Sequence, residues 1–278
     1  MPSLRALHAA GHQIQLVVTQ PDKPGHRMKV MSPPVKVAAR ELGLEVFQPE
    51  RIRAPETVER LRRLAPDVLV VVAYGQILTP EVIGIPRHGA VNVHASLLPR
   101  HRGPAPIPWT ILLGDDRAGV TIMQMDAGVD TGPILNQRST ALAGDETTPR
   151  LEASLAELGA NLLVVTLAGL PQGEIVARRQ PSEGATYARR LTGDDGDLDR
   201  AMSAAEMDRR VRSINPEPGC WITLGNGRVK VLEGYVATGR IGEPGHPIQT
   251  SSGIYLLHAV QPPGGKPMLV DAYLRGRR

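Results

Sequence analysis

Apolar residues in the first 170 positions fall into two patterns, short apolar runs and longer stretches with helical spacing. The run 67–73 is almost wholly apolar, which is typical of a strand that is covered on both faces. Strand-like runs that alternate with helix-like stretches predict a mainly parallel sheet with helices packed on it. We therefore expect a Rossmann-like α/β domain over residues 1–176. Its expected strands are 14–19, 44–47, 67–73, 89–94, 120–125 and 134–137, and its expected helices are 2–10, 35–42, 56–64, 105–113 and 148–167.

The pattern changes after residue 176. Residues 177–199 are charged and contain glycine, and we interpret them as a linker between domains. Ser203-Ala-Ala-Glu206 is a capping box that predicts a helix to about Ile214. Short β-like runs at 221–224, 229–235 and 253–260 follow, separated by Gly and Pro. They predict a small OB-like β-barrel domain over residues 200–278.

The first predicted element is a helix, residues 2–10, and not a strand. A parallel βαβ unit needs a strand before its first helix, and in a doubly wound sheet that strand is usually central. We therefore expect the α/β domain of this sequence to lack its first strand. Removing a central strand leaves unpaired sheet edges.

Composition narrows the class of protein. Hydrophobic residues make up 41% and charged residues 22%, which is typical of a globular protein. Cys220 is the single cysteine, so a disulfide framework is excluded and a reducing compartment is favoured. The sequence contains no uninterrupted apolar run of about eighteen residues, as a membrane span would need. We expect a cytoplasmic monomer without membrane association.

The formal net charge is +4, and arginine supplies most of the positive charge. Arginine-rich composition can reflect a GC-rich genome or a polyanionic ligand, and the sequence leaves both interpretations open. The basic stretch 20–34 likewise fits either a solvated surface loop or a loop that contacts phosphate. Aromatic residues are only 3% of the chain. Any nucleic-acid contact should therefore depend on phosphates and shape more than on base stacking.

The candidate chemistry lies where the strand 89–94 ends. Asn92 and His94 are two residues apart, so both side chains project from the same face of the strand. A carboxamide can donate to an oxyanion, and an imidazole can move protons near neutral pH. Asp130, in a turn rich in glycine, could orient His94 and stabilise its charged form. Each residue also has a purely structural interpretation, as a backbone cap, a buried histidine or a turn carboxylate.

Other chemistries receive little support from the sequence. Cys220 lies in the β-rich tail without an evident histidine partner, and no Cys/His spacing resembles a zinc site. His94 and His101 with Asp130 could be imagined as a metal triad, but both histidines flank a loop that contains cations. The sequence also has no Walker-type loop and no Gly-x-Gly-x-x-Gly after a strand, which argues against nucleotide-phosphate chemistry.

Asn92-x-His94, Ser96-Leu-Leu-Pro99 and Asp130-Thr-Gly132 resemble motifs of the folate-dependent formyltransferases, and among them of those that act on methionyl-tRNA. The resemblance covers nearly the whole chain, including its β-rich tail. The Asn-x-His pair with a distant Asp marks only the wider superfamily, and the combination of motifs is more specific. The matching motifs are Asn92-x-His94, Ser96-Leu-Leu-Pro99, Arg100-x-Arg102-Gly103, Gly119-Val-Thr-Ile-Met-Gln-Met-Asp126, Asp130-Thr-Gly132, Pro21-Asp-Lys-Pro24, Ser32-Pro-Pro-Val-Lys36, Val72-Ala-Tyr-Gly75, Asn215-Pro-x-Pro-Gly-x-Trp221 and Tyr273-Leu-Arg-Gly276.

The resemblance implies transfer of the formyl group of 10-formyltetrahydrofolate to the α-amino group of initiator methionyl-tRNA, as translation begins. It implies direct transfer, without a metal or a covalent enzyme intermediate. The loop 20–35 would reach the acceptor stem of the tRNA, and the β-rich tail would add backbone contacts. The implied catalytic residues are Asn92, His94 and Asp130; the implied folate-binding residues are Ser96, Leu97, Leu98, Pro99, Tyr74 and Gly75; and the implied tRNA-binding residues are Arg27 and Lys29.

The chain departs from the family at its start, since members begin with a strand and a Gly-Thr-Pro turn before the helix found here at 2–10. The stretch Gly25-His-Arg-Met-Lys29 is also less cationic than the family pattern. Three functions therefore stay open. They are the tRNA-directed enzyme, another folate-dependent formyltransferase or hydrolase, and a truncated RNA-binding relic without catalysis.

Overall fold

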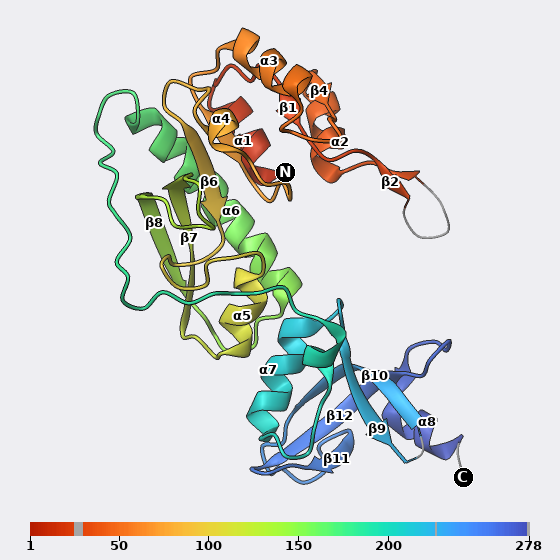
Figure 1. The fold of residues 1–278 in the computed structure, drawn as a ribbon. Helices are drawn as coiled ribbons and strands as arrows, with labels where there is room; N and C mark the ends of the chain where they lie inside the picture. The colour runs from red at the N-terminus through yellow and green to blue at the C-terminus, as the bar shows by residue number, and fades with distance from the viewer. Residues whose placement is uncertain (25–29, 226, 277–278) are drawn as a thin grey trace. The chain divides into compact units, whose positions relative to one another are not determined.

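The structure is a computed structural model that describes residues 1–24, 30–225 and 227–276 (Figure 1). The chain forms two compact units. The N-terminal unit contains residues 1–102, 119–140 and 153–187, and the C-terminal unit contains residues 103–118, 141–152 and 188 onward. The stretch 177–199, expected as a linker, divides between the two units after Tyr187.

The strands of the N-terminal unit form a mainly parallel arrangement with helices, as the sequence predicted. β5 pairs in parallel with β6, with Leu69 opposite Ala90, and β1 pairs in parallel with β4. The sheet then becomes antiparallel, because β7 pairs with β6 in the opposite direction. The sheet order is β5-β6-β7-β8. The bounds are β1 Val17–Val18, β4 Val46–Phe47, β5 Leu69–Val71, β6 Ala90–His94, β7 Arg117–Gln124 and β8 Ile134–Ala141.

β1 and β5 are both edge strands in the described part of the chain. Among the described residues, β1 pairs only with β4 and β5 pairs only with β6, so the strands form a two-stranded and a four-stranded sheet. The amides of Val17 and Thr19 donate to carbonyls around β4, which turns the amide of Val18 toward the other side of β1. In the described part of the chain, this side of β1 has no paired strand.

Helices of the N-terminal half begin where the sequence placed them, mostly at a proline. Proline fixes φ near the helical value and needs no hydrogen-bond acceptor in the first turn, so it favours a helix start. The short helix α4 was not predicted, and Thr79 caps it by accepting from the amide of Val82 at 3.4 Å. The bounds are α1 Pro2–Ala9, α2 Pro34–Glu41, α3 Pro55–Leu64, α4 Pro80–Ile83, α5 Pro106–Leu112 and α6 Thr148–Gly169.

Helix α6 supports the sheet from behind the candidate site. A side chain at Gly159 would collide with Val93 of β6 and Val120 of β7, so the helix packs directly on these strands. Val93 alternates with Asn92 and His94, which therefore face away from α6. By length and composition α6 could cross a membrane, but a buried core helix meets the same criteria.

The basic stretch 20–34 is not entirely irregular, as the sequence pattern had suggested. β2 (Lys23–Pro24) and β3 (Val30–Met31) pair as an antiparallel ribbon. Asp22 fixes its base, since it accepts from Lys36 Nζ at 2.6 Å and from Gln48 at 2.9 Å. The hydrogen bond from Lys36 is the main reason that the pKa of Asp22 lies below its ordinary value. Asp22 thereby connects the start of the ribbon to α2.

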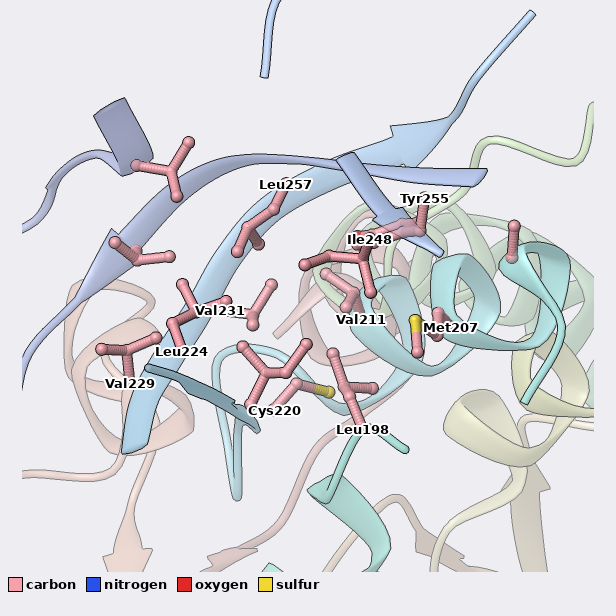
Figure 2. Packing of buried hydrophobic residues seen from close by; sticks show 14 of the residues in the cluster. Leu198, Met207, Val211, Cys220, Leu224, Val229, Val231, Ile248, Tyr255 and Leu257 are labelled. Carbon is pink, nitrogen blue, oxygen red and sulfur yellow. The ribbon is translucent and has the colours of Figure 1, made fainter. Parts of the chain in front are cut away.

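The C-terminal unit contains a curved antiparallel sheet, which agrees with the expected OB-like domain. The strand order is β11-β12-β10-β9, and β13 pairs with β12. Figure 2 shows the apolar core between this sheet and α7, with Met207, Ile248, Tyr255 and Leu257 fully buried. The capping box of Ser203 and Glu206 is present, as predicted. The bounds are η2 Gly193–Gly196, α7 Ala204–Ile214, β9 Cys220–Leu224, β10 Gly227–Val236, β11 His246–Gln249, β12 Ile254–Gln261, β13 Met268–Leu269 and α8 Val270–Arg275.

Four short elements of this unit were not predicted, namely η2, β11, β13 and α8. Each has at most six residues, and their apolar positions do not repeat long enough to produce a periodic pattern. β11 forms because its residues pair with β12, for example His246 with Leu257. Pairing with β12 therefore decides the structure of β11 and β13.

Candidate active site

Strand β6 presents the two polar side chains of the candidate site. Asn92 lies opposite Met123 and His94 lies opposite Thr121 across the β6–β7 ladder. Both face away from α6, as the period of a strand requires. β6 is an inner strand of its sheet, held by β5 on one edge and by β7 on the other, so the backbone that carries these side chains is fixed on both sides.

Asp130 comes from a distant turn and completes the cluster. Its Oδ1 lies 3.4 Å from Nδ2 of Asn92, and its Oδ2 lies 3.6 Å from Nδ1 of His94. The structure thus brings together the three residues that the sequence named as candidate catalytic groups. Asp130 has a φ of 52°, in the left-handed region, which Asp tolerates better than most residues.

His94 is held in a fixed orientation by contacts at both ring nitrogens. Its Nε2 lies 2.9 Å from the carbonyl oxygen of His101, an acceptor, so Nε2 carries a hydrogen and donates it. The side chain of His94 is only 6% exposed, and burial lowers its pKa from the ordinary value. The carboxylate of Asp130 opposes this shift by stabilising the protonated ring. The neutral ring therefore keeps its Nδ1 lone pair toward Asp130.

The loop that follows β6 is fixed by a dense set of hydrogen bonds. Thr121 Oγ1 donates to the carbonyl of Ser96 at 2.6 Å and accepts from the amide of Leu98 at 3.2 Å. Gln137 Nε2 donates to the carbonyl of Leu98 at 3.0 Å and to Thr121 Oγ1 at 2.8 Å. The peptide bond between Leu98 and Pro99 is cis. Side chains of β7 and β8 thus define the path of this loop.

The four loop residues expected at a folate site differ in exposure. Ser96 is buried and donates its hydroxyl to the carbonyl of Arg100 at 2.6 Å, and Leu98 is buried against Met123 and Ile134. Leu97 and Pro99 are half-buried. The side chains of Ser96 and Leu98 therefore shape the loop, while Leu97 and Pro99 remain accessible for contact with a ligand.

Tyr74 and Gly75 follow β5 at the same edge of the sheet, since β5 and β6 are parallel. The carbonyl of Tyr74 accepts from Gln20 Nε2 at 2.9 Å, which ties this loop to the end of β1. The hydroxyl of Tyr74 is buried with no hydrogen-bond partner in the described part of the chain, and burial raises the pKa of Tyr74. Gly75 has a φ of 80°, a conformation that favours glycine.

Other predicted site residues are either outside the described structure or unrelated to the cluster. Arg27 and Lys29, the expected tRNA contacts, lie outside the described residues. Cys220 is buried in the C-terminal core, where desolvation raises the pKa of its thiol to about 12. In the described residues, no group of three or more His, Cys, Asp or Glu side chains is placed to hold a metal ion.

Sequence reasoning missed the groups that support the cluster. Gln180 contacts the backbone of the Asp130 turn, and Arg102 contacts Gln180. Gln180 lies in a charged stretch without periodicity, so the sequence gives no local signal for it. Arg102 was seen only as part of a motif. Their contacts join residues that are 48 to 78 positions apart in the sequence, and no local pattern records such contacts.

Comparison with known proteins places this arrangement in a family. Residues 2–167 match the formyl transferase family, and residues 190–278 match the formyl transferase C-terminal domain family. The chain therefore belongs to the formyl transferase family, as the motifs had indicated. The methionyl-tRNA formyltransferase of Halorhodospira halophila strain DSM 244 / SL1 is 45% identical over 289 aligned positions, which cover 100% of this chain and 93% of that protein.

Other relatives and solved structures agree with this assignment. The methionyl-tRNA formyltransferase of Neisseria meningitidis serogroup C strain 053442 is 41% identical, covering 99% of this chain and 93% of that protein. An N-formyltransferase of Helicobacter canadensis, crystallised with folinic acid and dTDP-3-aminofucose, shares the fold with a TM-score of 0.65 and 16% identity, covering 92% and 93% of the two chains. HypX of Aquifex aeolicus with tetrahydrofolic acid gives 0.65 and 15%, covering 93% of this chain and 46% of HypX.

Proposed function

We propose that this protein transfers the formyl group of 10-formyltetrahydrofolate to the α-amino group of initiator methionyl-tRNA. The observation that carries the proposal is the convergence of Asn92 and His94 on Asp130, at 3.4 and 3.6 Å from its carboxylate oxygens, in a chain of this family. Relatives named methionyl-tRNA formyltransferase match it at 41–45% identity over almost its full length. The matches reach both units, so the whole chain supports the same assignment.

The reaction that we propose is a direct acyl transfer. The methionyl amine attacks the formyl carbon, and the carbonyl oxygen becomes an oxyanion. The C–N bond to the folate then breaks, and the proton lost by the amine is balanced by the proton gained by the departing folate nitrogen. The protein ends the cycle unchanged and needs to supply only an oxyanion donor and a group that holds a proton in transit.

Asn92 is the residue best placed to donate to the oxyanion. Within the described part of the chain, its Nδ2 has one long contact, with Asp130 at 3.4 Å, and the side chain is half-buried, so the amide can turn toward a ligand. His94 differs, because its Nε2 hydrogen is already donated to the His101 carbonyl. His94 could share in oxyanion stabilisation only after that bond breaks.

The pair of His94 and Asp130 is suited to hold the proton. The neutral ring has its Nδ1 lone pair toward the carboxylate, so a proton that arrives between them is attracted by both groups. Burial keeps the ring neutral before the reaction, and the carboxylate stabilises the charged ring during it. The negative charge on the oxyanion is thus assigned to Asn92, and the proton in transit is assigned to the pair of His94 and Asp130.

The basic ribbon and the C-terminal sheet are the surfaces that we assign to tRNA. Lys36 and Gln48 hold Asp22 at the base of the ribbon β2–β3, which fixes the chain where the ribbon begins. The β-rich unit distinguishes this chain from formyltransferases that lack such a tail. We expect both surfaces to contact phosphates, so that activity falls steeply as salt rises.

The decisive experiment offers 10-formyltetrahydrofolate with each of three acceptors, which are initiator methionyl-tRNA, an amino-sugar nucleotide and water. Formylation of the tRNA alone supports the proposal, and preference for either other acceptor refutes it. Binding of tetrahydrofolate, measured by calorimetry, separates the enzyme from an RNA-binding relic, which need not retain that site. Arg27→Ala should weaken tRNA use and reduce the salt slope by about one.

A further inference from the structure

The geometry points to Gln180 as a positioning residue that holds the Asp130 turn so that its carboxylate faces His94. This inference rests on the proposed function, since it concerns the same reaction. Gln180 lies between the two family matches, which end at residue 167 and resume at residue 190. It comes from the N-terminal unit, as do all of the residues with which it interacts.

Gln180 holds the turn through two hydrogen bonds from one nitrogen. Its Nε2 donates to the carbonyl of Asp130 at 2.9 Å and to the carbonyl of Gly132 at 2.7 Å. The side chain is 7% exposed. A buried amide with two good acceptors fixes the backbone on both sides of Thr131 and therefore the direction in which Asp130 projects.

Arg102 determines the orientation of that amide. Its Nε and Nη2 lie 3.0 and 2.8 Å from Oε1 of Gln180. A guanidinium can only donate, so the oxygen of the amide must face Arg102 and the nitrogen must face the turn. A rotated amide would place two donors against Arg102 and an acceptor against two carbonyls. The polar groups around Gln180 thus allow one orientation.

The Asp130 turn needs an external support. Asp130 lies in the left-handed region of φ, which a free turn would leave readily. Gly132 lies so close to the carbonyl of Gln124 that a Cβ there would be 1.8 Å from the oxygen, so the turn is pressed against β7. Gln180 holds the carbonyls on the other side of the same turn.

The segment that carries Gln180 is itself attached to the N-terminal unit on both sides. Before it, Arg178 and Ile134 exchange two backbone hydrogen bonds of 2.8 Å. After it, Thr186 accepts from the amide of Arg102 at 2.9 Å through its carbonyl and from the amide of His101 at 2.8 Å through its hydroxyl. The same segment thus contacts the loop whose His101 carbonyl orients His94.

The test compares Gln180→Met, which keeps the approximate volume and removes the polar groups, with Gln180→Glu, which keeps only an acceptor for Arg102. We expect both to lower kcat for formyl transfer by about 100-fold, because a shift of about 1 Å in a catalytic group has that effect. KM for both substrates should stay within about threefold. Gln15→Met is the matched control, since Gln15 is exposed and donates only to the Leu64 carbonyl.

A double-variant comparison identifies the path of the effect. If Gln180 acts through Asp130, then Gln180→Met in an Asp130→Asn background should change kcat by less than about twofold. In the wild-type background, Gln180→Met should also lower the pKa of His94 by about one unit, as followed by NMR, because the carboxylate turns away. Arg102→Met should produce the same changes more weakly.

Several results would overturn the inference. One is a wild-type kcat in Gln180→Met; another is an undiminished effect in the Asp130→Asn background; a third is an unshifted His94 titration. If thermal unfolding shows that Gln180→Met does not fold, Arg102→Met carries the same test. If the wild-type protein formylates no tRNA, the proposed function fails, whereas the His94 titration still decides whether Gln180 positions Asp130.

Discussion

Replacing Asp130 with Asn removes the charge beside His94 and keeps the shape of the side chain. Asp130 Oδ2 lies 3.6 Å from His94 Nδ1, and the carboxylate side chain is 17% exposed. At an effective dielectric constant of about 20, unit charges at this distance attract by about 4.6 kcal/mol. One pKa unit corresponds to about 1.4 kcal/mol, so the pKa of His94 should fall by up to about three units.

The same attraction sets the expected effect on the rate. If the charged ring forms fully in the transition state, losing about 4.6 kcal/mol lowers kcat by about 10³-fold. The sign of the pH effect follows from the pKa. Burial already places the pKa of His94 below its ordinary value, and Asp130→Asn lowers it further. The neutral ring then persists to lower pH, so the acid limb of the kcat profile moves to lower pH.

The assay is single-turnover formyl transfer to methionyl-tRNA between pH 5 and 8, with the His94 ring followed by NMR. Asp67→Asn is the matched control, since Asp67 precedes β5 at the opposite edge of the sheet and is exposed; its kcat should change by less than about threefold. A kcat for Asp130→Asn within tenfold of wild type would refute the assignment of the proton to this pair.

Three further outcomes are expected. Gly132→Ala should lower the free energy of unfolding by about 1–3 kcal/mol, measured by chemical denaturation, because the new Cβ would meet the Gln124 carbonyl. Gly193→Ala is the control, since a Cβ there has open space, and it should change the free energy of unfolding by less than about 0.5 kcal/mol. Cys220, with a buried thiol whose pKa is raised to about 12, should resist thiol reagents at pH 8 until the protein is denatured, and rapid native labelling would contradict its burial. In hydrogen exchange, the Val18 amide at the open edge of β1 should exchange faster than the Val17 amide, which donates to the Glu45 carbonyl; equal protection would mean that the edge is covered.

The elements that the sequence predicted well are those in which local pattern and tertiary role agree. The apolar run that includes β5 and the capping box of α7 each mark their element without help from distant residues. β5 itself is shorter than its apolar run, since pairing with β6 includes only Leu69–Val71. The strands of the ribbon β2–β3 have two residues each, which is too short to give an alternating pattern, and the ribbon was missed for that reason.

At the candidate site too, some features follow from the local sequence and others depend on tertiary contacts. Asn92 and His94 could be placed on one strand face from their spacing, and Asp130 was a candidate from its position in a glycine-rich turn. The spacing gave no reason to expect that the His101 carbonyl accepts from His94, because His101 belongs to a loop with a φ of 57°. Ser96 and Leu98 were expected at the folate site, yet burial shows that their side chains support the loop. Exposure depends on the packed structure and not on the motif.

The organisation of the site favours an enzyme over an RNA-binding relic. Holding Asp130 in a left-handed conformation is unfavourable by about 1 kcal/mol or more, and burying His94 opposes its protonation. Neither arrangement strengthens contact with a phosphate, because Asp130 is an anion. A protein that only binds RNA would be more stable with apolar or small residues at these positions. The hydrogen bonds from Gln180 instead maintain the unfavourable turn, and they keep a carboxylate beside a buried imidazole, which is the pair that the proposed formyl transfer uses.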